Sequence, residues 1–92
     1  LPDIPTFDEL GFKNIYAEAF AGVVVPAGTP ADIVAKLQKA VAAAVADPEI
    51  QKKLYDVGQE PVGGTSQQLG DILASETVRW HKLIKDLNIT LD

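Results

Sequence analysis

Residues able to carry out acid–base or nucleophilic chemistry are sparse in this 92-residue chain. His81 is the single histidine and cysteine is absent, which excludes a disulfide, a thiol nucleophile and a Cys-ligated zinc site. A general base needs a reacting group nearby, and no Ser–His–Asp pattern accompanies His81. We therefore predict that the chain is not an enzyme and holds no metal and no cofactor. His81 is expected at the surface or at the boundary of a core.

Glu76 is the carboxylate with the most unusual place in the sequence. On a helical wheel it falls inside an apolar stripe. The stripe consists of Leu69, Ile72, Leu73, Trp80, Leu83, Ile84 and Leu87. A buried carboxylate is costly unless it is paired and hydrogen-bonded. We expect Glu76 to meet a basic group or backbone amides at an interface, and direct contact with a ligand is the alternative.

Two glycine-containing turns precede predicted helices, and either could cradle an anion. One is Gly63-Gly64-Thr65 and the other is Gly28-Thr29-Pro30. The amino end of a helix presents free amides that suit an anion. Neither turn continues into the Gly-Lys-Ser/Thr of a phosphate-binding loop. We interpret both as plain turns and helix caps, with anion binding as the alternative.

Charge and hydropathy exclude other classes of partner. Lys and Arg number 8 against 13 Asp and Glu, so the net charge is −5 and nucleic acid is not expected as a partner. There is no apolar run of about 18 residues, the length of a membrane helix. The first residues lack the basic start and the apolar stretch of a signal peptide. The chain is either mature protein or an internal piece, and the missing initiator Met favours the second.

The first part of the chain predicts a short helix and a strand. Thr6 and Glu9 have the spacing of a capping box that would open the short helix, and Gly11 would end it. Residues 16–25 alternate between two faces and are predicted to form a strand, with the highest propensity at Val23-Val24-Val25.

Three helices are predicted over residues 30–46, 48–57 and 66–87, because apolar stripes there are flanked by helix caps. The predicted caps at the start are Thr29, Asp47 and Thr65, and the predicted ends are Gly58 and Asn88. Trp80 is expected to be largely buried against the helix that begins at Pro30.

Several motifs in one order resemble a known family. The motifs are LPDIPTFDELGF, PAGTP, ADPEIQKKL, the segment 58–63 and ETVRW followed by Ile84 and Leu87-Asn88-Ile89. Together they resemble the substrate-binding proteins of tripartite tricarboxylate transporters, the Bug-type extracytoplasmic receptors, over essentially all 92 residues. The resemblance implies an α/β fold: residues 1–92 would be the C-terminal third of a two-lobed, type II periplasmic-binding-protein fold. Residues 1–25 would form the short helix and a strand connecting the lobes, and residues 26–92 the helical part with three main helices.

The resemblance also implies a function. The protein would work in the bacterial periplasm, capture a small organic acid or related metabolite between two lobes, and deliver it to a membrane permease. Phe20 would be the best ligand contact, with Ala19 and Ala21 beside it and Thr6 as a weaker candidate; a core position is the alternative for Phe20. The family often carries Trp near Phe20, so an aromatic wall would be smaller here.

Two further protein partners are expected. The N-terminal part of the same protein would complete the cleft, and the isolated chain is expected to form a homo-oligomer. A different class of function is a small helical module that binds a partner protein through the stripe of its last helix.

Overall fold

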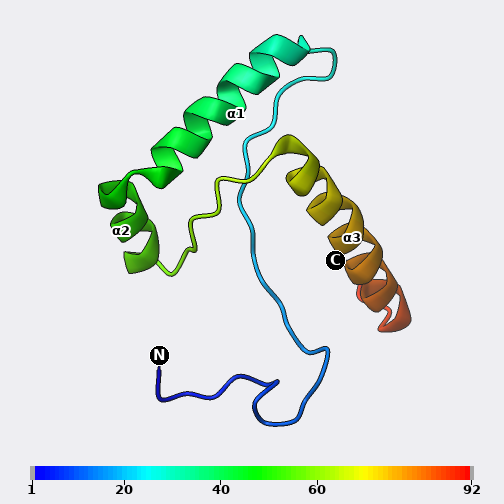
Figure 1. Cartoon of the computed structure of the whole chain (residues 1–92). Helices are drawn as coiled ribbons and strands as arrows, with labels where there is room; N and C mark the ends of the chain where they lie inside the picture. The colour runs from blue at the N-terminus through cyan, green and yellow to red at the C-terminus, as the bar shows by residue number, and fades with distance from the viewer. Residues whose placement is uncertain (1, 92) are drawn as a thin grey trace.

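The computed structural model describes residues 2–91, and three helices account for its regular structure (Figure 1). Helix α1 spans Ala31–Ala46, α2 spans Pro48–Asp56 and α3 spans Ser66–Asp86. Each lies within one residue of its predicted bounds. Leu1 and Asp92, the two ends of the predicted single segment, lie outside the described residues.

The predicted α/β class is wrong for this chain, because no strand occurs between residues 2 and 91. Residues 16–25 run as a long extended segment between α1 and α3 (Figure 1). No backbone hydrogen bond joins this segment to another part of the described chain. A strand exists through the ladder that it forms with a neighbour. The high propensity at Val23-Val24-Val25 therefore produces an extended segment without a sheet.

The predicted short helix near the N-terminus is also wrong, although its capping box is present. The Glu9 amide donates to Thr6 Oγ1 at 3.2 Å, and the Thr6 amide donates to Glu9 Oε2 at 3.1 Å. Hydrogen-bonded turns follow up to Gly11, whose φ of 89° ends them in the predicted left-handed conformation. Helix nucleation costs more than so few residues can return, so the segment does not grow past a turn.

Local caps fix the helix ends at most of the predicted positions. Asp47 Oδ1 accepts the amides of Glu49 at 2.8 Å and Ile50 at 3.3 Å, and Thr65 forms a reciprocal capping box with Gln68. Gly58 and Asn88 end α2 and α3 with φ angles of 77° and 51°. In both cases the next amide bonds back to the carbonyl five residues earlier, the bond of a Schellman motif.

Thr29 does not cap α1 as predicted. Its hydroxyl donates to the carbonyl of Pro26 at 2.8 Å, and Pro30 occupies the cap position without a side-chain bond. The hydroxyl thus stabilises the preceding turn and leaves the first amides of α1 without a side-chain acceptor.

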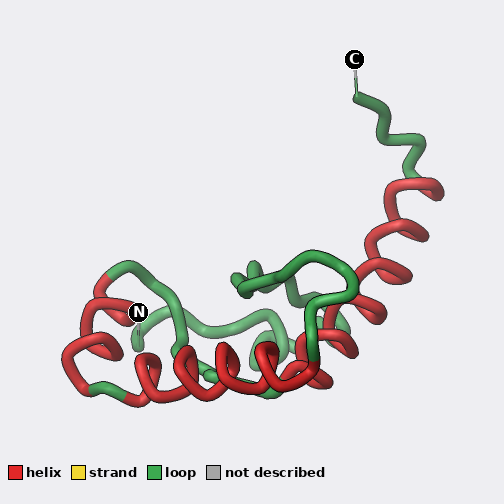
Figure 2. Tube along the Cα trace, turned by 90° about the horizontal axis from the view of Figure 1, so that it is seen from above, coloured by secondary structure: helices red, strands yellow, loops and turns green. Residues whose placement is uncertain are grey.

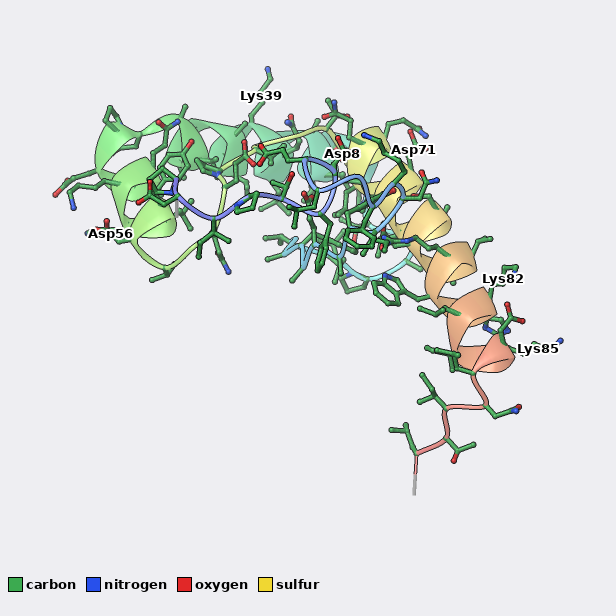
Figure 3. All side chains as sticks on the ribbon, turned by 90° about the horizontal axis from the view of Figure 1, so that it is seen from below. Asp8, Lys39, Asp56, Asp71, Lys82 and Lys85 are labelled. Atoms are coloured by element: carbon green, nitrogen blue, oxygen red, sulfur yellow. The ribbon has the colours of Figure 1, made fainter. Side chains whose placement is uncertain are left out.

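The described residues form no buried core. α1 packs against α2, whereas the far half of α3 projects away from the other helices (Figure 2). Figure 3 shows Lys82 and Lys85 on this projecting half, while Asp71 lies on the other half, near the start of α3. Trp80 is half-buried, so the prediction that it is largely buried is wrong. A single layer of helices and one extended segment cannot enclose a large aromatic side chain.

Gly63 offers a test of the link between α2 and α3. Its φ is 61°, and a Cβ there would lie 3.5 Å from both Ala42 Cα and Val45 Cβ, which is ordinary contact. Gly63→Ala is therefore limited by backbone strain and not by space, and we expect a loss of about 1–2 kcal/mol in the free energy of unfolding.

Denaturant unfolding of the full-length protein would measure this loss. Gly70→Ala is the matched control, because Gly70 lies inside α3 with open space around its Cα. That change should stabilise the helix by about 0.5–1 kcal/mol. Equal midpoints for Gly63→Ala and the parent would show that the left-handed turn is not needed.

Candidate functional site

A groove with a volume of about 460 Å³ lies between residues 20–25, one face of α1 and the first turns of α3. Its apolar lining includes Phe20, Val25, Leu37, Val41, Leu69 and Ile72. Helical periodicity explains the α1 side, because Val34, Leu37 and Val41 follow the i, i+3, i+7 spacing of one face.

Gly22 lets the extended segment approach α3 closely. A Cβ built at this position would lie only 2.8 Å from Leu69 Cδ2. The missing side chain thus permits this close approach, since a Cβ at position 22 would require the Leu69 side chain to move.

The polar groups of the groove are mostly engaged with one another. Gln38 Nε2 donates to the carbonyl of Gly64 at 3.3 Å, which joins α1 to the turn before α3. Thr65 and Gln68 serve each other in the capping box, and Asp71 accepts from Gln67 at 2.9 Å. The turn at Gly63 and Gly64 thus acts as the predicted cap.

The charged and dipolar groups of the groove lining do not favour an anion. Asp71 is the charged residue of the lining, and Lys, Arg and His are absent from it. The amino end of α3 at Thr65 and Ser66 carries a positive partial charge, worth about 0.3–1 kcal/mol to a nearby anion. The Asp71 carboxylate opposes that attraction. These walls can therefore hold the apolar part of a ligand but supply no cation for a carboxylate.

The structure separates the four predicted ligand contacts. Phe20 and Ala21 line the groove, whereas Ala19 and Thr6 are not part of its lining. The Thr6 hydroxyl accepts the Glu9 amide within its own turn. Sequence reasoning did not single out the groove residues of α1, because their periodicity indicated only an apolar face.

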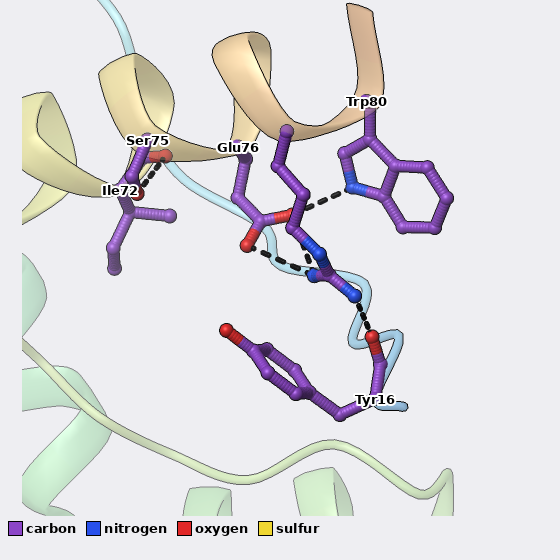
Figure 4. Close-up of polar contacts among 6 residues, drawn as sticks. Tyr16, Ile72, Ser75, Glu76 and Trp80 are labelled. Carbon is purple, nitrogen blue, oxygen red and sulfur yellow. Dashed lines mark hydrogen bonds and ion pairs between the residues drawn. The ribbon is translucent and has the colours of Figure 1, made fainter. Parts of the chain in front are cut away.

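A second cluster forms around Glu76, as Figure 4 shows. Both carboxylate oxygens lie 3.4 Å from Arg79 Nη1, and Trp80 Nε1 donates to Glu76 Oε2 at 2.6 Å. The expectation that Glu76 meets a basic group is confirmed, although Arg79 lies on the same helix and the predicted interface is not seen among the described residues. Arg79 and Tyr16 complete the cluster and were not predicted. The i, i+3 spacing of Glu76 and Arg79 was a signal that could have identified the ion pair.

The remaining candidate, His81, belongs neither to the groove lining nor to the hydrogen bonds around Glu76. His81 is exposed, as predicted. Among residues 2–91, no group of three or more His, Asp and Glu side chains is placed to hold a metal ion. None of the three described helices is long and apolar enough to cross a membrane.

Comparisons with known proteins identify the family. A family model described as "Tripartite tricarboxylate transporter family receptor" matches residues 1–89. The "UPF0065 protein in tcbD-tcbE intergenic region" of Pseudomonas sp. is 34% identical over 90 residues, which is 97% of this chain and 27% of the relative. A second relative is the "UPF0065 protein in clcB-clcD intergenic region" of Pseudomonas knackmussii, 40% identical over 85 residues, with 91% and 50% of the two chains covered. "Protein BugT" of Bordetella pertussis is 27% identical over 90 residues, with 98% and 28% covered.

No solved structure matches the chain. The chain spans between about a quarter and a half of the length of these curated relatives. The family is one of solute-binding receptors and not of enzymes, in agreement with the prediction from the sequence. Since the family model covers the chain up to residue 89, the protein belongs to the tripartite tricarboxylate transporter receptor family.

Proposed function

We propose that the chain is part of a periplasmic receptor that captures a small organic acid or related metabolite and delivers it to the membrane permease of a tripartite tricarboxylate-type transporter. The observation that carries this proposal is the match to the receptor family over residues 1–89. The mechanism is capture without chemistry: two lobes close on the solute, and closure is a population shift driven by contacts to both lobes.

Phe20 and Ala21 are the proposed ligand contacts in this chain, with Ala19 and Thr6 as flanking candidates. Support comes from the place of Phe20 and Ala21 on the wall of the groove. The lining has an apolar surface and one carboxylate, Asp71, so it lacks a partner for the charge of an organic acid. We propose that the donors for the ligand carboxylates come from the rest of the protein, because the relatives extend well beyond this chain.

A thermal-shift screen of the full-length protein with mono-, di- and tricarboxylic acids tests the proposed function. A ligand at a hundred times its dissociation constant stabilises the folded state by about 2.7 kcal/mol. For a protein of this class we expect the Tm to rise by roughly 5–10 °C with the correct acid. Matched sodium chloride controls remove the effect of ionic strength. If none of the acids raises the Tm above the sodium chloride control, organic-acid capture is the wrong function.

The second candidate is a helical module that binds a partner protein through α3. It is favoured by the exposure of the stripe on that helix, where Leu73, Leu83 and Ile84 are each about 44% exposed. The gene distinguishes the two functions. An open reading frame that continues upstream of Leu1 through a signal peptide supports the receptor, and one that starts near Leu1 supports the module.

A further inference from the structure

Arg79 is the polar link between the N-terminal segment and the helices. Its Nη2 donates a hydrogen bond to the backbone carbonyl of Tyr16. Within residues 2–91, no other hydrogen bond connects residues 2–25 to any of the three helices. The position of the extended segment on α3 therefore depends on this side chain and on apolar contact.

Several contacts restrict the Arg79 guanidinium to one position. Its Cζ lies 4.2 Å from the centre of the Tyr16 ring and 4.9 Å from that of the Trp80 ring, the geometry of cation–π contacts. The Glu76–Arg79 side chains are 21% and 31% exposed, whereas the Lys82–Asp86 pair is 76% and 55% exposed. A pair that is partly withdrawn from water is less screened than an exposed one.

Two contacts with α3 bracket Phe20 in the extended segment. Tyr16 meets α3 at Arg79, and Gly22 meets it at Leu69. Ten residues separate Leu69 from Arg79, which is about 15 Å along a helix. Six residues separate Tyr16 from Gly22, which is at most about 20 Å of extended chain. Fixing both ends therefore limits how far the residues between them can move away from α3.

We propose that Arg79 is a positioning residue that clamps residues 16–25 onto α3 and so holds Phe20 at the wall of the groove. Its effect on ligand affinity rests on the proposed function; its effect on the segment does not. Only a planar guanidinium can bond a carbonyl and a carboxylate while stacking on two rings, so Lys cannot replace it.

Limited proteolysis of the full-length protein with chymotrypsin tests the clamp without any ligand. Mass spectrometry follows cleavage after Phe20, and cleavage after Tyr55 at the end of α2 reports general unfolding. Arg79→Gln should speed cleavage after Phe20 by about tenfold, the factor expected from losing one charge-assisted hydrogen bond of a partly exposed group. Arg79→Lys, which keeps the charge and the helix propensity, should behave like Arg79→Gln. Lys82→Gln is the matched control and should leave the rate unchanged.

The outcomes separate the clamp from the proposed function. Unchanged cleavage after Phe20 in Arg79→Gln, or equal acceleration in Lys82→Gln, overturns the clamp. Full protection by Lys at position 79 overturns it as well, because a simple charge would then suffice. Calorimetric titration with citrate is the second readout, and the dissociation constant should rise about tenfold in Arg79→Gln. If citrate and the other acids do not bind the parent protein but the cleavage pattern is as expected, the clamp stands and organic-acid capture fails.

Discussion

Residues 1–92 produced on their own are expected to associate, and not to sediment as a compact monomer. Their accessible surface is 8270 Å², whereas a folded monomer of 9.8 kDa exposes about 5,200 Å². The radius of gyration is 17.0 Å against about 12 Å for a compact domain of this length. No residue of the described chain is buried, and Val24 and Val62 are each 79% exposed. Such a surface gives too little burial to offset the loss of chain entropy.

The amount of extra exposed surface indicates what kind of partner must cover it. About 3,000 Å² of surface is left open, several times the roughly 800 Å² that one partner contributes to a standard interface. The unpaired backbone at Val23-Val24-Val25 is a ready edge for another strand. We therefore expect the rest of the same protein to cover this surface, and a second copy to replace it when the chain is alone.

Sedimentation velocity at several concentrations would measure the association, with the full-length protein as control. We expect the sedimentation coefficient of the short chain to rise with concentration and that of the full-length protein to stay constant. A concentration-independent, compact monomer that unfolds cooperatively would contradict the expectation. Citrate titration of both proteins should show that the short chain loses most of the affinity, because contacts from both lobes are needed.

The helices could be predicted from the sequence because their determinants lie within a few residues of each other. Asp47 needs only the amides of Glu49 and Ile50, and the Thr65 capping box is closed by a residue three positions away. Gly58 and Asn88 end their helices by bonds to carbonyls of the preceding turn. Capping of this kind does not depend on the tertiary structure of the rest of the chain.

The strand could not be predicted correctly, because it depends on a neighbour. Residues 16–25 have the alternation and the valines of a strand, yet no described segment pairs with them. The burial of Trp80 could not be predicted for the same reason, since it depends on what packs on α3 and not on the place of Trp80 in the stripe. The alternation of Ala19 and Ala21 also failed to place both in the groove, because an unpaired segment need not keep the pleat of a sheet.

The site was partly accessible to sequence reasoning. The resemblance drew attention to Phe20, but the Arg79–Tyr16 contact joins residues 63 positions apart and has no periodic signal. Only the Glu76–Arg79 half of that cluster is local enough to read from spacing.

Phe20→Ala is expected to weaken binding of the acid found in the thermal-shift screen by about three- to tenfold. Phe20 lines the groove and is 46% exposed, so its ring is free to be covered by a ligand. Fully burying an aromatic side chain of this size is worth about 1.5–3 kcal/mol, and a ligand can cover only the exposed half of the ring. The contribution is then about 0.7–1.4 kcal/mol, which corresponds to that range in the dissociation constant. Because the groove offers no cation, apolar contact is the main interaction that this wall can make.

Phe12→Ala is the matched control, since Phe12 is 56% exposed, stacks edge-on with Phe7 and lies outside the groove lining. It removes the same atoms and should leave the dissociation constant unchanged.

Calorimetric titration of the full-length variants, paired with their Tm without ligand, separates a ligand contact from a core residue. A ligand contact loses affinity with little change in Tm. If Phe20→Ala instead lowers the Tm by several degrees and the folded protein binds the acid as tightly as the parent, Phe20 packs in a core formed with the rest of the protein. The ligand wall must then be sought on the α1 and α3 sides of the groove, at the apolar lining residues Leu37, Val41 and Ile72.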